Sequence, residues 1–260
     1  MSAPAPAFDQ VLSLSLSVTY GRRPPIFTDL SLNMRRGEIL GLVGGSGCGK
    51  STLALAILRL LDTKGATAIG ALHFNGRNLL SLSEREMRRV RGREIGLVLQ
   101  SPMSALNPML RIGRQLREAW RAHREDNNGE TEIAETLRRV DLPHSPDFLK
   151  RYPSEISVGQ AQRVLIAMAI LHGPDLLIAD EPTSALDAIT QIGALELFRE
   201  INRQSGSSIL LISHDLAAVE SICDRVAVLY EGKIVECRAV GDMFSEASHP
   251  YTRALFQGYR

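Results

Sequence analysis

Residues able to bind phosphate are concentrated in one glycine-rich stretch, residues 44–52. Its spacing is G-x-x-x-x-G-K-S, made by Gly44, Gly45, Ser46, Gly47, Cys48, Gly49, Lys50, Ser51 and Thr52. Glycines let a backbone wrap closely, so that successive N–H groups point at phosphate oxygens. In this pattern Lys50 reaches the β- and γ-phosphates of a nucleotide, and the Ser51 hydroxyl binds Mg²⁺. The stretch therefore predicts a site for a Mg²⁺-nucleotide such as ATP.

Two carboxylates follow a second apolar run. Residues 176–179 are all apolar, and Asp180 and Glu181 come directly after them. Buried acids need a partner, which a Mg²⁺-nucleotide supplies. We expect Asp180 to act on Mg²⁺, directly or through water, and Glu181 to be the general base that polarises the attacking water. The alternative is that these acids cap the next helix, which could explain one of them but does not explain both.

Two more polar side chains end apolar runs. Gln100 closes the run 94–99 before Ser101-Pro102, and His214 follows the run 208–212. Open α/β sheets bind ligands at the carboxyl ends of their strands. A lone histidine is usually structural, but three polar residues at three strand ends (Gln100, Asp180 and His214) predict one shared site.

The elements that position these residues indicate an α/β fold. Residues 39–43 are predicted to form a buried strand and residues 53–58 a buried helix, with the glycine-rich loop between them. Residues 11–20 alternate apolar and polar types, residues 26–34 resemble a strand, and Asn75-Gly76 after 71–74 indicates a tight turn. We predict a mostly parallel core with flanking helices and an antiparallel β subdomain beside it.

A helical subdomain is predicted to interrupt the alternation of strands and helices. From Pro102 the apolar positions recur at helical spacing for about 75 residues without a strand. Within this region Ser157 to Gly159 form the start of a helix, a place that can hold an anion. Five arginines within 85–93 are interleaved with Glu84, Glu86 and Glu94, which favours a solvated helix face over a nucleic-acid patch.

Composition places the chain among ordinary globular proteins. It has 260 residues, 44% hydrophobic and 23% charged, with a net charge of +1. No apolar run is long enough to span a membrane, and Met1 to Pro6 do not resemble a secretory signal. The three cysteines, at positions 48, 223 and 237, have neither metal-ligand nor disulfide spacing, which is typical of a reducing compartment.

Together these motifs resemble the ATP-binding-cassette (ABC) ATPases over nearly the whole chain. The resemblance identifies residues 44–51 as Walker A, Gln100 as the Q-loop, 156–160 as the signature, 176–181 as Walker B, 184–187 as the D-loop and His214 as the H-loop. It implies that Ser157, Gly159, Gln160 and Asp187 also bind nucleotide, that Gln100 contributes to the Mg²⁺ site, and that Tyr20 stacks on adenine. From the residues alone, Tyr20 is better explained as an ordinary strand aromatic.

Two further stretches resemble the oligopeptide, dipeptide and nickel importer ATPases, namely Ser101 to Pro108 and His249 to Thr252. The resemblance implies a peripheral subunit on the cytoplasmic face of the inner membrane. Its implied partners are a second ABC ATPase, two integral-membrane permease subunits and an extracytoplasmic substrate-binding protein, with no nucleic acid. Some relatives bind an iron–sulfur cluster after the His-Pro-Tyr motif, and we predict none here because no cysteine cluster follows it.

The signature departs from the family pattern, because Val158 stands where glycine is usual. Family members pair head to tail, so that Ser157 and Gly159 act on the ATP of the partner. If the backbone at Val158 needs a positive φ or a close phosphate contact, valine is penalised by roughly 1–3 kcal/mol. We therefore hypothesise a heterodimer with unequal sites.

The predicted organisation is a single ABC ATPase domain over 1–260. Residues 8–100 and 174–240 form the nucleotide-binding core with its β subdomain, 101–173 the helical subdomain and 241–260 a short C-terminal extension. The predicted function is energising uptake of peptides or of nickel or a metal chelate, with the short tail leaning toward the metal. A soluble ABC ATPase acting on nucleic acid or ribosomes is the alternative, although the chain lacks a second Walker loop or a heptad run.

Overall fold

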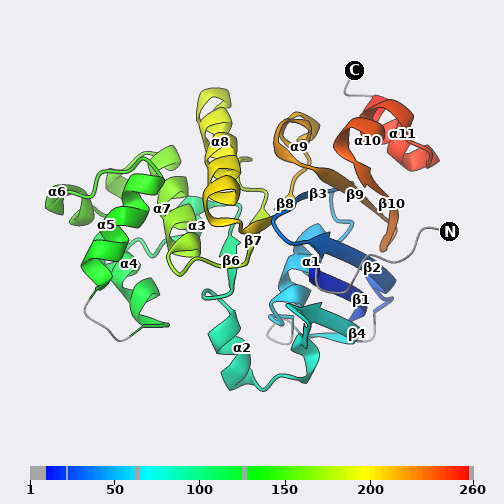
Figure 1. The fold of residues 1–260 in the computed structure, drawn as a ribbon, viewed down its shortest axis with the longest axis horizontal. Coiled ribbons are helices and arrows are strands. Elements are labelled where there is room, and N and C mark those ends of the chain that lie inside the picture. Colours follow the sequence, from blue (N-terminus) through cyan, green and yellow to red (C-terminus); the bar gives the residue numbers. More distant parts are fainter. Residues whose placement is uncertain (1–9, 22, 62–64, 125–127, 258–260) are drawn as a thin grey trace.

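The computed structural model describes residues 10–21, 23–61, 65–124 and 128–257. The N-terminal stretch Met1 to Pro6, on which we based the expectation of no secretory signal, lies outside these ranges. Two sheets lie at the centre and lower right of Figure 1, a group of helices lies to the left, and the C-terminal helices lie at the upper right. The predicted α/β class is confirmed.

The central sheet is mostly parallel. In the described part of the chain it has six strands in the order β10-β9-β3-β8-β7-β6. The strands are β3 (Ile39–Val43), β6 (Ile95–Val98), β7 (Leu176–Asp180), β8 (Ser208–Ile212), β9 (Arg225–Tyr230) and β10 (Lys233–Ala239). β3 runs parallel to β8 and β9, β7 runs parallel to β6 and β8, and β10 is antiparallel to β9. Burial on both faces explains why the parallel strands β3, β7 and β8 are nearly continuous apolar runs.

The predicted antiparallel sheet packs beside this core. Its order is β2-β1-β4-β5, with strands β1 (Gln10–Tyr20), β2 (Phe27–Arg35), β4 (Ala66–Phe74) and β5 (Arg77–Asn78). Asn75 and Gly76 both have positive φ, 49° and 75°, as the tight turn between β4 and β5 requires. One face of β1 is buried against the core through Leu12, Leu14 and Leu16.

The helices to the left in Figure 1 come from the region predicted to be helical. They are α3 (Pro102–Ala105), α4 (Ile112–Arg121), α5 (Gly129–Arg139), α6 (Pro146–Leu149), η3 (Pro153–Glu155) and α7 (Val158–Ile170). The arginine-rich segment before β6 forms η2 (Leu79–Ser81) and α2 (Glu84–Val90). A capping box between Ser83 and Glu86 starts α2. Arg88 and Arg91 pair with Glu84, so this segment is a solvated helix face as predicted.

The remaining helices flank the central sheet and its C-terminal edge. They are α1 (Lys50–Ile57), α8 (Ala188–Ser205), α9 (Leu216–Ile222), α10 (Val240–Glu246) and α11 (Pro250–Gln257). In α8 the apolar residues Ile189, Ile192, Leu195, Phe198 and Ile201 recur at helical spacing, but the first two are not buried. Ile189 and Ile192 are 85% and 59% exposed, because the buried part of α8 begins only at Ala194.

Candidate functional site

The polar residues at the strand ends meet the glycine-rich loop in one cavity. It has a volume of about 380 Å³. Its lining residues are Ser46, Gly47, Gly49, Lys50, Ser51, Thr52, Gln100, Glu181 and His214. Gln100 lies two residues beyond β6, Glu181 one beyond β7 and His214 two beyond β8, so the neighbouring strands bring them together. The carboxyl edge of the parallel sheet is where such folds bind ligands.

The loop has the backbone of a phosphate cradle. Gly47 and Gly49 have φ of 76° and 107°, a region that other residues enter only with strain. A Cβ at Gly49 would lie 2.6 Å from the Phe27 ring, whereas one at Gly47 would meet nothing within 4 Å. The position of Gly49 therefore requires glycine for both its backbone conformation and its packing. The position of Gly47 requires glycine for its backbone conformation only.

Lys50 begins α1 and is 7% exposed. Its Nζ donates to the carbonyl oxygens of Gly44, at 2.9 Å, and Gly45, at 3.1 Å. These two carbonyls satisfy the buried Lys50 side chain beside the cavity, at the N-terminal end of the helix. The loop thus offers a cation, helix-terminal N–H groups and an open glycine backbone, a set that fits the phosphates of ATP.

The side-chain oxygens of Asp180 and Ser51 meet at the start of α1. The Ser51 hydroxyl donates to Asp180 Oδ1 over 3.1 Å. Burial raises the pKa of Asp180, the Ser51 hydrogen bond opposes that rise, and the neighbouring carboxylate of Glu181 adds to it. A hard dication beside these two oxygens would favour the ionised carboxylate, so the donor set fits Mg²⁺.

Glu181 is held in an unusual backbone conformation. Its φ is 50°, which for a residue other than glycine costs about 1–3 kcal/mol. The Glu181 N–H donates to the carbonyl of Ile212 at the end of β8, over 2.9 Å, and this bond stabilises the turn. The side chain is 13% exposed and accepts from His214 Nδ1 over 2.6 Å. An ionised carboxylate can only accept, so this contact requires the His214 tautomer that has its proton on Nδ1.

Not every residue predicted to bind nucleotide lines this cavity. Gly44, Gly45 and Cys48 are not among its lining residues, and the first two accept hydrogen bonds from Lys50 through their carbonyls. Tyr20 is half-buried at the end of β1, pairs with Ala66 of β4 and is not among the lining residues. The adenine-stacking role of Tyr20 stays a prediction.

The signature residues lie together at a second place. Ser157 caps α7 in a capping box with Gln160, each donating its N–H to the other side chain over 3.1 Å. Asp187 caps α8 by accepting from Ile189 and Thr190. A Cβ on Gly159 would lie 2.6 Å from Thr190 Cγ2, so the starts of α7 and α8 touch there. None of the four predicted residues lines the strand-end cavity.

The structure corrects one premise about Val158. This residue is the first of α7 and is absent from the described residues with positive φ. Its backbone is therefore helical, and valine pays no left-handed strain at this position. Its side chain is 41% exposed, and its proximity to a phosphate of a partner chain stays a prediction.

Sequence reasoning missed one residue that touches the loop. The Gly45 N–H donates to the Tyr251 hydroxyl over 2.8 Å, although the two residues are 206 positions apart. The His-Pro-Tyr-Thr stretch had marked this part of the chain only as a resemblance. No spacing rule could have indicated the contact, because it depends on how α11 docks.

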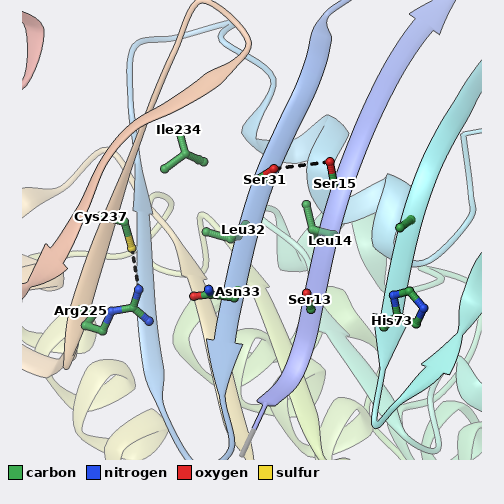
Figure 2. Close-up of a pocket in the computed structure, with 11 residues that line it drawn as sticks. Ser13, Leu14, Ser15, Ser31, Leu32, Asn33, His73, Arg225, Ile234 and Cys237 are labelled. Carbon is green, nitrogen blue, oxygen red and sulfur yellow. Dashed lines mark hydrogen bonds between the residues drawn. The ribbon is translucent and has the colours of Figure 1, made fainter. Parts of the chain in front are cut away.

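A second cavity, of about 430 Å³, lies between β1, β2, β4 and the β9–β10 hairpin (Figure 2). Ser13, Ser15, Asn33 and His73 supply much of its polar lining. Its cation, Arg225, donates to the Glu38 carboxylate and to Cys237 Sγ over 2.9 and 3.0 Å. That guanidinium already has its partners, which leaves the strand-end cavity as the better phosphate site.

Comparison with known proteins places the chain in a family. A family model described as "ABC transporter" matches residues 27–184. The "Probable peptide ABC transporter ATP-binding protein y4tR" of Sinorhizobium fredii (strain NBRC 101917 / NGR234) is 46% identical over 87% of this chain and 68% of its own length. The "Dipeptide transport ATP-binding protein DppD" of Bacillus subtilis (strain 168) is 42% identical over 91% of this chain and 72% of its own length.

Solved structures agree on the fold. A dimeric post-hydrolysis state of the ATP-binding cassette MJ0796 bound to ADP and Pi superposes with a TM-score of 0.76 and 26% identity, over 88% of this chain and 98% of that one. The structure of cbiO1 from Clostridium perfringens, at 24% identity, has a TM-score of 0.80 over 92% of both chains and supports the fold alone.

The chain belongs to the ABC transporter family. Within that family it is the ATP-binding component, an ATPase that couples ATP hydrolysis to transport. Among the described residues, no helix has both the length and the apolar character needed to cross a lipid bilayer.

Proposed function

We propose that this chain is the ATPase subunit of a peptide importer and works as one of a pair of cassettes on the cytoplasmic face of the inner membrane. Two permease subunits and an extracytoplasmic binding protein would complete the assembly. The observation that carries the proposal is the strand-end cavity, where the phosphate loop meets Gln100, Glu181 and His214. The names of the relatives support peptides over nickel or a metal chelate, against the leaning that we drew from the short tail.

Each lining residue has a role in the proposed reaction. The N–H groups at the start of α1 and the Lys50 ammonium bind the phosphates of ATP. Lys50 exchanges its carbonyl partners for phosphate oxygens of the incoming nucleotide. Ser51, Asp180 and Gln100 would hold Mg²⁺, which neutralises developing charge on the phosphates.

Glu181 accepts a proton from the attacking water as the water oxygen bonds to the γ-phosphorus. The bond from that phosphorus to the β–γ bridging oxygen breaks, and its electron pair leaves with ADP. His214 holds the carboxylate in place through its Nδ1–H. The left-handed turn at Glu181 fixes the carboxylate beside the loop before substrate arrives. This arrangement is preorganised, so little free energy is lost to reorientation in the transition state.

The signature residues are proposed to complete the site of a second cassette. Ser157, Gly159, Gln160 and Asp187 lie away from this chain's own cavity, as a head-to-tail pair requires. Binding of two ATP molecules between the cassettes would close the pair, and hydrolysis would reopen it. The dimeric state of MJ0796 bound to ADP and Pi supports the pairing of two cassettes. Val158 is the basis for the further hypothesis that the partner cassette is a different chain.

The test is ATP turnover by the purified chain, alone and reconstituted with permeases, a second cassette and a binding protein. Glu181→Gln should reduce turnover about 10²–10⁴-fold, which is the usual contribution of a general base. Glu196→Gln is the matched control, because it makes the same change on an exposed side chain of α8. Stimulation by binding protein loaded with peptide, but not with a nickel chelate, supports the peptide assignment. The proposal is refuted if Glu181→Gln and Glu196→Gln turn over ATP at the same rate.

A further inference from the structure

The C-terminal helix contacts the phosphate loop directly. Tyr251, in the first turn of α11, accepts a hydrogen bond from the Gly45 N–H over 2.8 Å. Gly45 is the second residue after β3 and opens the loop. A Cβ at Gly45 would lie 3.2 Å from the same hydroxyl, so the phenol fills the space beside this peptide.

The Gly45 peptide is held from both sides. Its carbonyl accepts from Lys50 Nζ over 3.1 Å and from the Cys48 N–H over 3.3 Å, while its N–H is satisfied by Tyr251. The Gly44 carbonyl accepts from the same lysine over 2.9 Å. The first turn of the loop therefore has three groups that set its orientation, and one of them comes from the far end of the sequence.

The ring of Tyr251 is clamped as well. It stacks on Tyr230 at the end of β9, with ring centroids 4.0 Å apart and an interplanar angle of 24°. β9 is the parallel neighbour of β3, which leads into the loop. A hydrogen bond with the Glu231 side chain raises the pKa of Tyr230. The stack fixes the plane of the Tyr251 ring and so the direction of its hydroxyl.

A buried carboxylate anchors the start of α11. The Glu236 side chain on β10 is 4% exposed and accepts from the N–H and the hydroxyl of Ser248, over 3.0 and 2.9 Å, and from the His249 N–H, over 3.1 Å. Arg238 pairs with the same carboxylate over 2.9 Å. His249 Nδ1 accepts from the Tyr251 N–H over 3.2 Å. The anchor, the stack and the hydroxyl form one continuous connection from β10 to the loop.

We propose that Tyr251 is a positioning residue for nucleotide binding, holding the first turn of the phosphate loop in its binding geometry through the Gly45 N–H. The inference rests on the proposed role of the loop in binding ATP. Without the hydroxyl, the partly buried N–H loses its acceptor and the loop gains conformational freedom that ligand binding must remove. Because neither Tyr251 nor Gly45 lines the cavity, ATP and ADP should be affected alike.

The variant that isolates this bond is Tyr251→Phe, which keeps the ring and its stacking and removes the hydroxyl. Tyr230→Phe is the matched control, because it removes the other hydroxyl of the same stacked pair. The measurements are the Kd values for ADP and for a nonhydrolysable ATP analogue, each with Mg²⁺, by titration calorimetry on the full chain. Loss of one hydrogen bond predicts a Kd increase of about 2- to 10-fold for Tyr251→Phe. Tyr230→Phe should bind like the wild type.

Amide hydrogen exchange provides a readout that a general loss of packing would not give. The Gly45 amide should exchange faster in Tyr251→Phe, while amides in β7 and β8 keep their protection. Equal Kd values and equal Gly45 exchange in wild type and Tyr251→Phe would overturn the inference, and so would tighter binding by the variant. If the wild type itself binds neither ligand, the proposed function fails, and that outcome is distinct from failure of the Tyr251 assignment alone.

Discussion

The contact between Gly159 and Thr190 allows a prediction whose sign depends on one methyl group. A Cβ added at Gly159 would lie 2.6 Å from Thr190 Cγ2, closer than real Cβ contacts. Thr190 cannot rotate away freely, because its hydroxyl donates to Asp187 Oδ2 over 2.7 Å and its N–H donates to Oδ1 of the same carboxylate. Gly159→Ala must therefore shift α7 against α8 or break the cap of α8.

The magnitude follows from two opposing terms. Overpacking costs about 1–3 kcal/mol. Alanine in place of glycine within a helix returns up to about 1 kcal/mol. Gly159→Ala should therefore lower the free energy of unfolding by about 1–2 kcal/mol. Thr190→Ser removes the obstructing methyl group and keeps the hydroxyl on Asp187, so in that background Gly159→Ala should become neutral or stabilising by up to about 1 kcal/mol.

Urea unfolding of the wild type, both single variants and the double variant forms the thermodynamic cycle. The expected coupling energy is about 1–3 kcal/mol, and Gly159→Ala should destabilise the wild type but not the Thr190→Ser background. That result would mean that Gly159 is needed for packing between α7 and α8. If Gly159→Ala destabilises both backgrounds equally, the clash is absorbed elsewhere and the reasoning is wrong. ATP turnover of the same variants in the assembled complex would show whether this packing bears on the partner's site.

Three further predictions concern Lys50, Val158 and Glu236. Lys50→Ala should abolish detectable ATP binding in calorimetry while the chain stays folded, and retained affinity would contradict the assigned role of the ammonium. Val158→Gly should lower the stability of α7 by about 0.5–1 kcal/mol. It should change ATP turnover only in an assembly with a second cassette. An unchanged rate of turnover and transport in that assembly would refute the hypothesis of unequal sites. Burial alone would raise the pKa of Glu236, but hydrogen bonds from Ser248 and His249 outweigh it and lower the pKa from 4.5 to about 2. This stabilisation, about 3 kcal/mol, is complete above pH 4.5 and is lost as the pH falls toward 2, so the excess stability of wild type over Glu236→Gln should shrink across that interval in urea titrations.

Local chemistry made much of the site predictable. The loop at 44–52 and the carboxylates after β7 could be found from the sequence because glycine, lysine and paired acids have few alternative uses in those patterns. Apolar runs ending in Gln100 and His214 indicated parallel strands, and parallel strands bring their carboxyl ends to one edge. The cavity lined by these residues is a geometric consequence of that topology.

Several features depended on packing across long stretches of chain. The exposure of Ile189 and Ile192 reflects where α8 leaves the core, which periodicity cannot indicate. The helical backbone at Val158 follows from the cap at Ser157, and the need for Gly159 from a neighbour on α8. These are properties of helix contacts, and the pattern within one segment does not contain them.

The sequence by itself determined the family, the α/β class and the residues that can bind a nucleotide, because these depend on residue types at short, fixed spacings. Only the tertiary structure decided how the loop is supported. Tyr251 reaches Gly45 across 206 positions because β9 and β10 place α11 beside the loop and Glu236 anchors it there. A hydrogen bond needs its atoms within about 3 Å. For two residues far apart in the chain, that distance depends on how all the helices and strands between them pack together.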